Sequence, residues 1–174
     1  GVIQNLKEKG YDVSLLEQEP IPESGNIQIR LPYTPCMTEQ ERNLITGFKG
    51  EIIVYEKLKS LGYNPTCPSI STDANYTHIV TVNGKKYYCL PNFERFDISF
   101  VTSNGQQVFI EVKSTTSRVG QIENMPISSS EWSMIDECSN QSGKTYFLVR
   151  VFGIDRPNQD IYIFNASSDL NTFI

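Results

Sequence analysis

The chain has 174 residues, of which 39% are hydrophobic and 20% charged, and its formal net charge is -5 at neutral pH. A chain of this size and composition can bury about 70% of the surface that it exposes when unfolded, which predicts one main folded domain. No stretch approaches the roughly 20 apolar residues of a membrane span and no signal-peptide pattern opens the chain, so we expect a soluble, intracellular protein without a membrane partner.

Residues 1–37 are predicted to be a linker or a packing arm, because they contain four of the nine prolines: Pro20, Pro22, Pro32 and Pro35. The chain begins without methionine, and we expect it to be a piece of a longer protein with further domains. Residues 38–174 are predicted to form the folded domain.

An amphipathic helix is predicted over residues 38–62. Thr38 and Glu41 have the spacing of a capping box, and Gly62 supplies the end of the helix. At 100° per residue an apolar stripe forms from Leu44, Phe48, Ile52, Tyr55 and Leu58.

Glu51 falls inside this stripe, between Tyr55 and Leu58. A glutamate on the buried face of a helix needs either an ionic partner such as Lys113, a position at the end of the stripe, or a place beside a metal site. Gly47 and Gly50 would let the helix approach a sheet closely.

Seven further elements follow the first helix. Strands are expected near residues 77–82, 85–90, 96–102 and 107–113, then a helix at about 129–140, then strands at 144–152 and 160–164.

The strands near 96–102 and 107–113 carry two carboxylates, Asp97 and Glu111, in apolar runs. Asn104-Gly105 between them predicts a hairpin. A three-residue loop with Gly105 left-handed would place Asp97 opposite Glu111, whereas a two-residue loop would send their side chains to opposite faces. A shared metal site therefore requires the three-residue loop or a bulge. The other face of the hairpin is expected to be apolar, made by Phe96, Ile98, Phe100, Val108, Ile110 and Val112.

Facing carboxylates repel each other, and a divalent cation would offset the repulsion. Their hard oxygen atoms suit Mg²⁺ or Mn²⁺. Lys113, on the same face as Glu111, would orient the attacking water and stabilise charge on a phosphate. The alternative is a surface ion pair between Lys113 and one of the two carboxylates.

The second helix is predicted to begin at a cap formed by Ser128 to Glu131, so Glu131 has a capping role that competes with any catalytic one. A helix between two strands permits a parallel crossover. The predicted fold is therefore α/β (mixed α+β), a central mixed sheet flanked by helices, with element order α-β-β-β-β-α-β-β.

Three segments together resemble the PD-(D/E)XK nuclease superfamily: Gly47 to Glu51, Phe96-Asp97-Ile98, and Phe109 to Thr116 with its Glu111-Val112-Lys113 triplet. Within it, residues 38 to 165 are most similar to the domain at the C-terminus of the plant protein NO VEIN, which also occurs in bacterial defence proteins. The resemblance implies a restriction-endonuclease-like core, with Asp97, Glu111 and Val112 as metal ligands, Lys113 as catalytic lysine and Glu51 as auxiliary acid.

We therefore expect a Mg²⁺- or Mn²⁺-dependent nuclease module that acts on DNA and leaves a 5'-phosphate. The alternative is an inactive domain of the same fold that binds nucleic acid or protein. The acidic net charge argues against strong binding of nucleic acid, because affinity for the phosphate backbone comes largely from lysine and arginine. The four cysteines lie far apart and are expected to be free thiols.

Overall fold

The computed structural model describes residues 37–119 and 127–167. The chain divides into two compact units, residues 1–44 and 45–174, and nearly all described residues belong to the second. The predicted arm, residues 1–37, and Cys36 therefore lie almost wholly outside the described residues. Within them, no helix is both long and apolar enough to cross a membrane.

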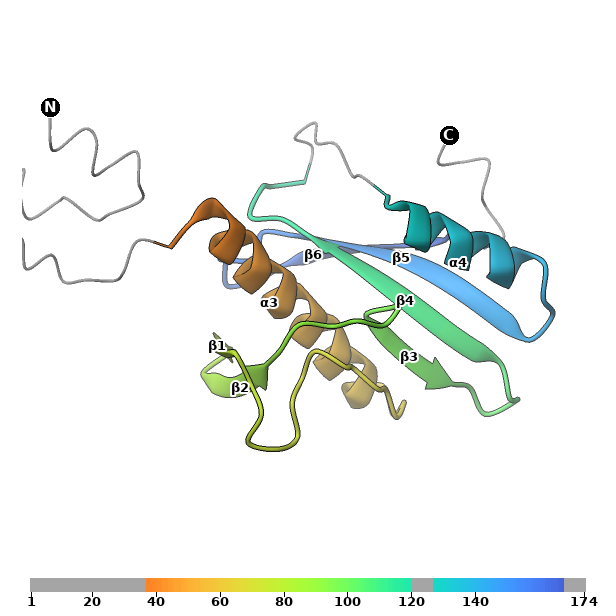
Figure 1. Ribbon diagram of the computed structural model, residues 1–174, viewed down its shortest axis with the longest axis horizontal. Helices are drawn as coiled ribbons and strands as arrows, with labels where there is room; N and C mark the ends of the chain where they lie inside the picture. Colours follow the sequence, from red (N-terminus) through yellow and green to blue (C-terminus); the bar gives the residue numbers. More distant parts are fainter. Residues whose placement is uncertain (1–36, 120–126, 168–174) are drawn as a thin grey trace, which may run out of the picture. The chain divides into compact units, whose positions relative to one another are not determined.

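The described elements appear in the predicted order, which confirms a mixed α/β fold (Figure 1). They are α3 (Glu39–Ser60), β1 (His78–Val82), β2 (Lys85–Cys89), β3 (Ile98–Val101), β4 (Gln107–Ser114), α4 (Ser129–Ser139), β5 (Lys144–Phe152) and β6 (Asp160–Asn165). Each predicted boundary lies within two residues of the observed one.

The strands form two sheets and not the single sheet that the sequence predicted. Strands β1 and β2 form a separate antiparallel hairpin, and the other sheet has the order β3-β4-β5-β6. Among the described strands, only β4 and β5 pair in parallel, and α4 lies between them in the chain, as the crossover prediction required. The β1–β2 hairpin is linked to its surroundings by the isolated bridge between Ile70 and Cys89.

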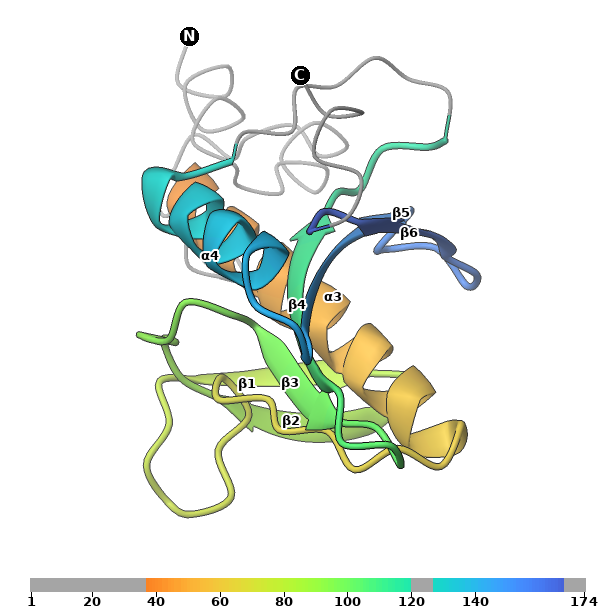
Figure 2. The same ribbon diagram turned by 90° about the vertical axis from the view of Figure 1, so that its right-hand side faces the viewer.

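The two helices contact opposite faces of the four-stranded sheet, as Figure 2 shows from the side. Successive β4 side chains point to alternate faces. One face packs with α3 in a cluster that contains Val54, Val108, Ile110, Val112 and Val149. The other packs with α4 in a cluster that contains Phe109, Met134, Ile135, Tyr146 and Leu148.

Helix α3 is buried on two sides, because it also packs on the β1–β2 hairpin. Phe48 and Ile52 belong to the cluster with that hairpin, whereas Val54 faces the four-stranded sheet. The predicted stripe missed Val54, and it wrongly included Leu44, which is 37% exposed. A stripe drawn for one buried face cannot describe a helix that contacts two sheets.

Gly50 allows the close approach of α3 to β4, as predicted. A Cβ atom at this position would lie 1.6 Å from Ser114 Oγ and 2.7 Å from Ser114 Cβ. The prediction for Gly47 is wrong, because a Cβ atom there would meet nothing within 4 Å. At the other end, Gly62 (φ 93°) terminates the helix as predicted.

Candidate active site

The β3–β4 hairpin has the predicted three-residue loop. Gly105 is left-handed (φ 85°), and the Thr102 N–H donates to the Gln106 carbonyl at 2.9 Å. Ile98 pairs with Ile110, which is the register that this loop sets. The register therefore brings the beginning of β3 beside the centre of β4, where Glu111 lies.

Asp97 lies at a local irregularity of the hairpin. Its N–H donates to the Ile110 carbonyl at 2.9 Å, although the ladder pairs Ile110 with Ile98. Asp97 and Ile98 thus both oppose Ile110, as in a β-bulge. A bulge changes the direction in which the neighbouring side chains of the same strand point. Phe96 consequently packs on Phe109, with ring centroids 5.3 Å apart, and not on the face of Ile98 where it was expected.

Asp97 connects the acidic side chains of the site. Its Oδ2 atom accepts a hydrogen bond from the Val112 N–H at 2.8 Å. Its carboxyl group is also within hydrogen-bond reach of Glu51 and Glu111. Glu51 is only 8% exposed and has a hydroxyl partner in the buried Ser69. The structure therefore brings Asp97, Glu111 and Glu51 together, from three different elements.

The electrostatics of this group follow from its burial. Burial, and next the negative charge of Asp97, raises the pKa of Glu51 to about 10. The same two causes, with the charge of Glu131, raise the pKa of Glu111 to about 9. Burial also raises the pKa of Asp97, against the opposing effect of its hydrogen bonds. Without a cation, the three carboxyl groups cannot all be ionised at neutral pH.

Lys113 is held by two acids. Its ammonium donates to both carboxylate oxygens of Glu131, at 2.7 and 2.8 Å, and lies 3.6 Å from Glu111 Oε1. The three side chains are between 14% and 18% exposed. The sequence predicted a capping role for Glu131 that competes with any catalytic one, and it did not predict the pairing of Glu131 with Lys113. The predicted cap is also present, because Ser128 and Glu131 form a capping box at the start of α4. The sequence of this segment contained no other indication of the role of Glu131.

The segment that carries most of this site matches a known protein family. The model of the family described as protein NO VEIN, C-terminal, matches residues 75–164, just over half of the 174 residues. The chain belongs to the NO VEIN C-terminal family. No curated protein and no solved structure matches it. Glu51 lies before the matched segment, which contains the other members of the cluster: Asp97, Glu111, Lys113 and Glu131.

The donor atoms of this NO VEIN C-terminal domain fit a hard divalent cation. Asp97 and Glu111 offer carboxylate oxygens, and the Val112 carbonyl points to the same strand edge as its N–H, toward Asp97. In the described part of the chain, no three His, Cys, Asp or Glu side chains already form a metal cage. Two carboxylates and a carbonyl leave positions for water and phosphate oxygens, as Mg²⁺ commonly requires.

A buried hydroxyl group near the acidic residues has no partner of its own among the described residues. The Tyr146 Oη atom is fully buried and has no hydrogen-bond partner among the described residues. Burial, followed by the charges of Glu111 and Glu131, raises the pKa of Tyr146. A buried hydroxyl group without a protein partner is a position at which ordered water is commonly found in proteins.

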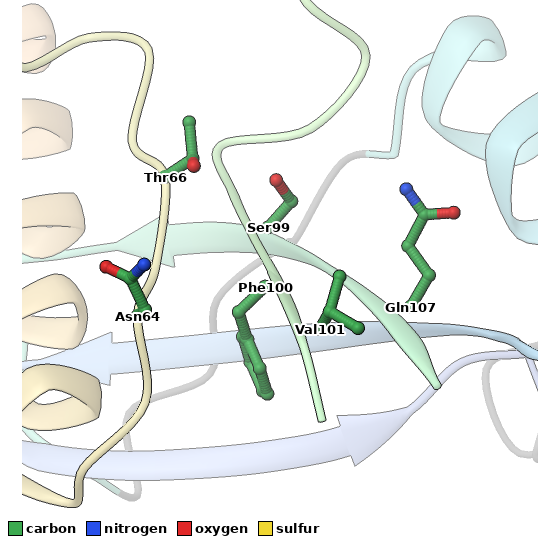
Figure 3. Close-up of a pocket in the computed structure, with 6 residues that line it drawn as sticks. All are labelled: Asn64, Thr66, Ser99, Phe100, Val101 and Gln107. Atoms are coloured by element: carbon green, nitrogen blue, oxygen red, sulfur yellow. The ribbon is translucent and has the colours of Figure 1, made fainter. Parts of the chain in front are cut away.

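A shallow pocket in the NO VEIN C-terminal domain lies along β3 and does not include the acidic cluster (Figure 3). Its volume is about 250 Å³. It contains no charged side chain, because it is lined by Asn64, Thr66, Ser99, Phe100, Val101 and Gln107. This pocket therefore contains no titratable side chain.

Proposed function

We propose that the domain hydrolyses phosphodiester bonds in nucleic acid, with DNA as the substrate, and uses Mg²⁺ or Mn²⁺. The observation that carries the proposal is the balance of charge in the site. Four acidic side chains, those of Glu51, Asp97, Glu111 and Glu131, share the site with one lysine, which is paired with Glu111 and Glu131. Buried carboxylates in such excess are expensive unless a cation neutralises them.

Asp97, Glu111 and the Val112 carbonyl would hold the cation. When bound, it would polarise a phosphoryl oxygen and lower the pKa of a coordinated water. The Val112 N–H fixes the Asp97 carboxylate through its hydrogen bond, which leaves the other carboxylate oxygen for coordination. Glu51, which holds its proton at neutral pH, donates a hydrogen bond to the Asp97 carboxylate and would serve as the auxiliary acid of the site.

Lys113 would act on the substrate. An ammonium group has three N–H donors, and Glu131 takes two of them. The remaining donor is available to a phosphate oxygen or to the attacking water, on the side of Glu111. This role, like that of Asp97 and Glu111, is the one that the PD-(D/E)XK resemblance implies, so we assign the domain to that superfamily as part of the proposal.

The test is a cleavage assay with the purified protein. Supercoiled plasmid, single-stranded DNA and RNA are incubated with Mn²⁺, with Mg²⁺ and with EDTA. We expect cleavage of DNA that EDTA abolishes and that Asp97→Ala removes. Asp155→Ala is the matched control, because it deletes an exposed acid whose side chain is 63% accessible. Failure of the wild-type protein to bind metal or to cut any of the substrates would refute the proposal.

A second candidate is a binding module without catalysis, which the incomplete metal cage of the described residues favours. The net charge of -5 favours a protein over a nucleic acid as the partner of such a module. It predicts that the wild-type protein binds neither Mn²⁺ nor Mg²⁺ in isothermal titration. A nuclease must bind one of them, so the same titration separates the two candidates.

A further inference from the structure

Glu131 makes two sets of contacts with a single carboxylate. As the third residue of helix α4, it completes a capping box: its backbone N–H donates to Ser128 Oγ at 3.2 Å, and its Oε2 accepts from the Ser128 N–H at 3.4 Å. The same carboxylate receives both hydrogen bonds from Lys113. The N-terminus of α4 is therefore joined directly to the lysine of the site.

The position of Glu131 is fixed by packing as well as by the cap. Met134, Ile135 and Cys138 of α4 are each at most 3% exposed and belong to the cluster against β4 and β5. Glu131 lies one turn before Ile135 on the same helix. Because Glu131 is fixed through both its backbone and its side chain, its carboxylate restricts the position of the Lys113 ammonium that it binds.

The restriction matters because a lysine side chain is otherwise flexible. Four rotatable bonds let an unrestrained ammonium sample many positions, and this freedom is lost each time that it binds a phosphate. Glu131 occupies two of the three donors and leaves Lys113 beside Glu111, 3.6 Å away. The third donor is thereby directed to the region where Asp97 and Glu111 lie.

We propose that Glu131 is a positioning residue of the active site: it holds the Lys113 ammonium in the orientation that a phosphate oxygen or the attacking water requires, and it does so from the N-terminus of α4. This inference rests on the proposed nuclease function. It predicts that the charge of Glu131 matters for turnover, independently of the contribution of the cap to helix stability.

Two substitutions separate the two contributions. A glutamine at the third position of a capping box retains the cap, so Glu131→Gln keeps the helix start and removes the charge that holds Lys113. Ser128→Ala does the reverse, because it deletes the hydroxyl of the cap and leaves the Glu131 carboxylate for Lys113. Emission from Trp132, the only tryptophan in the chain, reports whether each variant folds.

In the Mn²⁺-dependent plasmid assay, Glu131→Gln should lower kcat by about 10- to 100-fold with KM changed less than about twofold, as for residues that orient a catalytic group. Ser128→Ala should lower the melting temperature and leave kcat within about twofold of the wild-type value. Unchanged kcat in Glu131→Gln, or equal losses in both variants, would overturn the inference.

A second measurement does not depend on activity. With lysine labelled at the ε-carbon, the two ε-protons of Lys113 should give separate NMR signals when the ammonium is held, and the Lys113→Arg spectrum assigns them. Glu131→Gln should merge these signals, whereas Ser128→Ala should preserve them. Unchanged signals in Glu131→Gln would overturn the inference, whether or not the wild-type protein cleaves nucleic acid. Absence of cleavage with the expected NMR result would refute the nuclease function alone.

Discussion

Glu51→Gln is expected to stabilise the metal-free protein. Burial and the charge of Asp97 raise the pKa of Glu51 from 4.5 to about 10. Below pH 4.5 the group is protonated in both folded and unfolded chains. Above it, the unfolded chain releases a proton that the folded protein retains, so the free energy of unfolding falls as pH rises toward 10. Glutamine has a similar shape and no proton to release.

The magnitude follows from the width of this pH window. At pH 7 the pH is 2.5 units above the 4.5 of the unfolded group, and at about 1.36 kcal/mol per unit the penalty is about 3.4 kcal/mol. The variant loses one hydrogen bond, which reduces this gain in the free energy of unfolding by about 1 kcal/mol. The net gain of about 2 kcal/mol corresponds to a rise of about 4–8 °C in melting temperature for a chain of this length.

The assay is urea unfolding in EDTA at several pH values between 5 and 9, for the wild-type protein, Glu51→Gln and the exposed-acid control Glu94→Gln. The advantage of Glu51→Gln should grow with pH, whereas Glu94→Gln should follow the wild-type curve. If Glu51→Gln is less stable than the wild-type protein at pH 8, Glu51 is ionised and paired in the fold, and the reasoning is refuted.

Three further predictions concern the helix, the metal and the lysine. Gly50→Ala should lower the free energy of unfolding, measured in urea, by about 1–3 kcal/mol, because its Cβ atom would overlap Ser114. Gly47→Ala should raise it by up to about 1 kcal/mol, because alanine favours the helix and meets no neighbouring atom there. Equal effects of the two substitutions would show that α3 can shift away from β4. Binding of Mn²⁺ must displace protons from carboxyl groups of raised pKa, so its affinity should increase from pH 6 to pH 9, and isothermal titration in two buffers of different ionisation enthalpy would measure the released protons. Constant affinity over this range would contradict a site made of these acids. Lys113→Ala should abolish cleavage and retain Mn²⁺ binding, while Asp97→Ala should lose both; full cleavage by Lys113→Ala would reduce this lysine to a charge-balancing role.

The sequence predicted those parts of the site that depend on local geometry. Asn104-Gly105 predicted a hairpin with either of two loop lengths, and the requirement that Asp97 and Glu111 share a face chose the three-residue loop that sets the observed pairing. The position of Glu51 in the helix followed similarly from its 100° spacing, and its burial confirms the prediction. In both cases, the predicted feature depends on residues that are close together in the sequence, within one turn or one helix.

The parts that the sequence did not predict depend on contacts between elements. The pairing of Glu131 with Lys113 requires knowing how α4 docks on the sheet, and the capping box already accounted for that glutamate. The different environments of Gly47 and Gly50 depend on which side of α3 faces β4. Phe96 changed face because a bulge interrupts the alternation that the prediction assumed.

The docking of helices on opposite faces of the sheet has a consequence for the time at which the site forms. A hairpin such as β3–β4 closes in microseconds, and it alone brings Asp97 to Glu111. Glu51 and Glu131 arrive only after α3 and α4 have packed on separate faces, which requires contacts between distant parts of the chain. In the proposed nuclease, a nascent or partly unfolded chain would therefore hold two carboxylates without the lysine held in place, and it would not cleave nucleic acid before folding is complete.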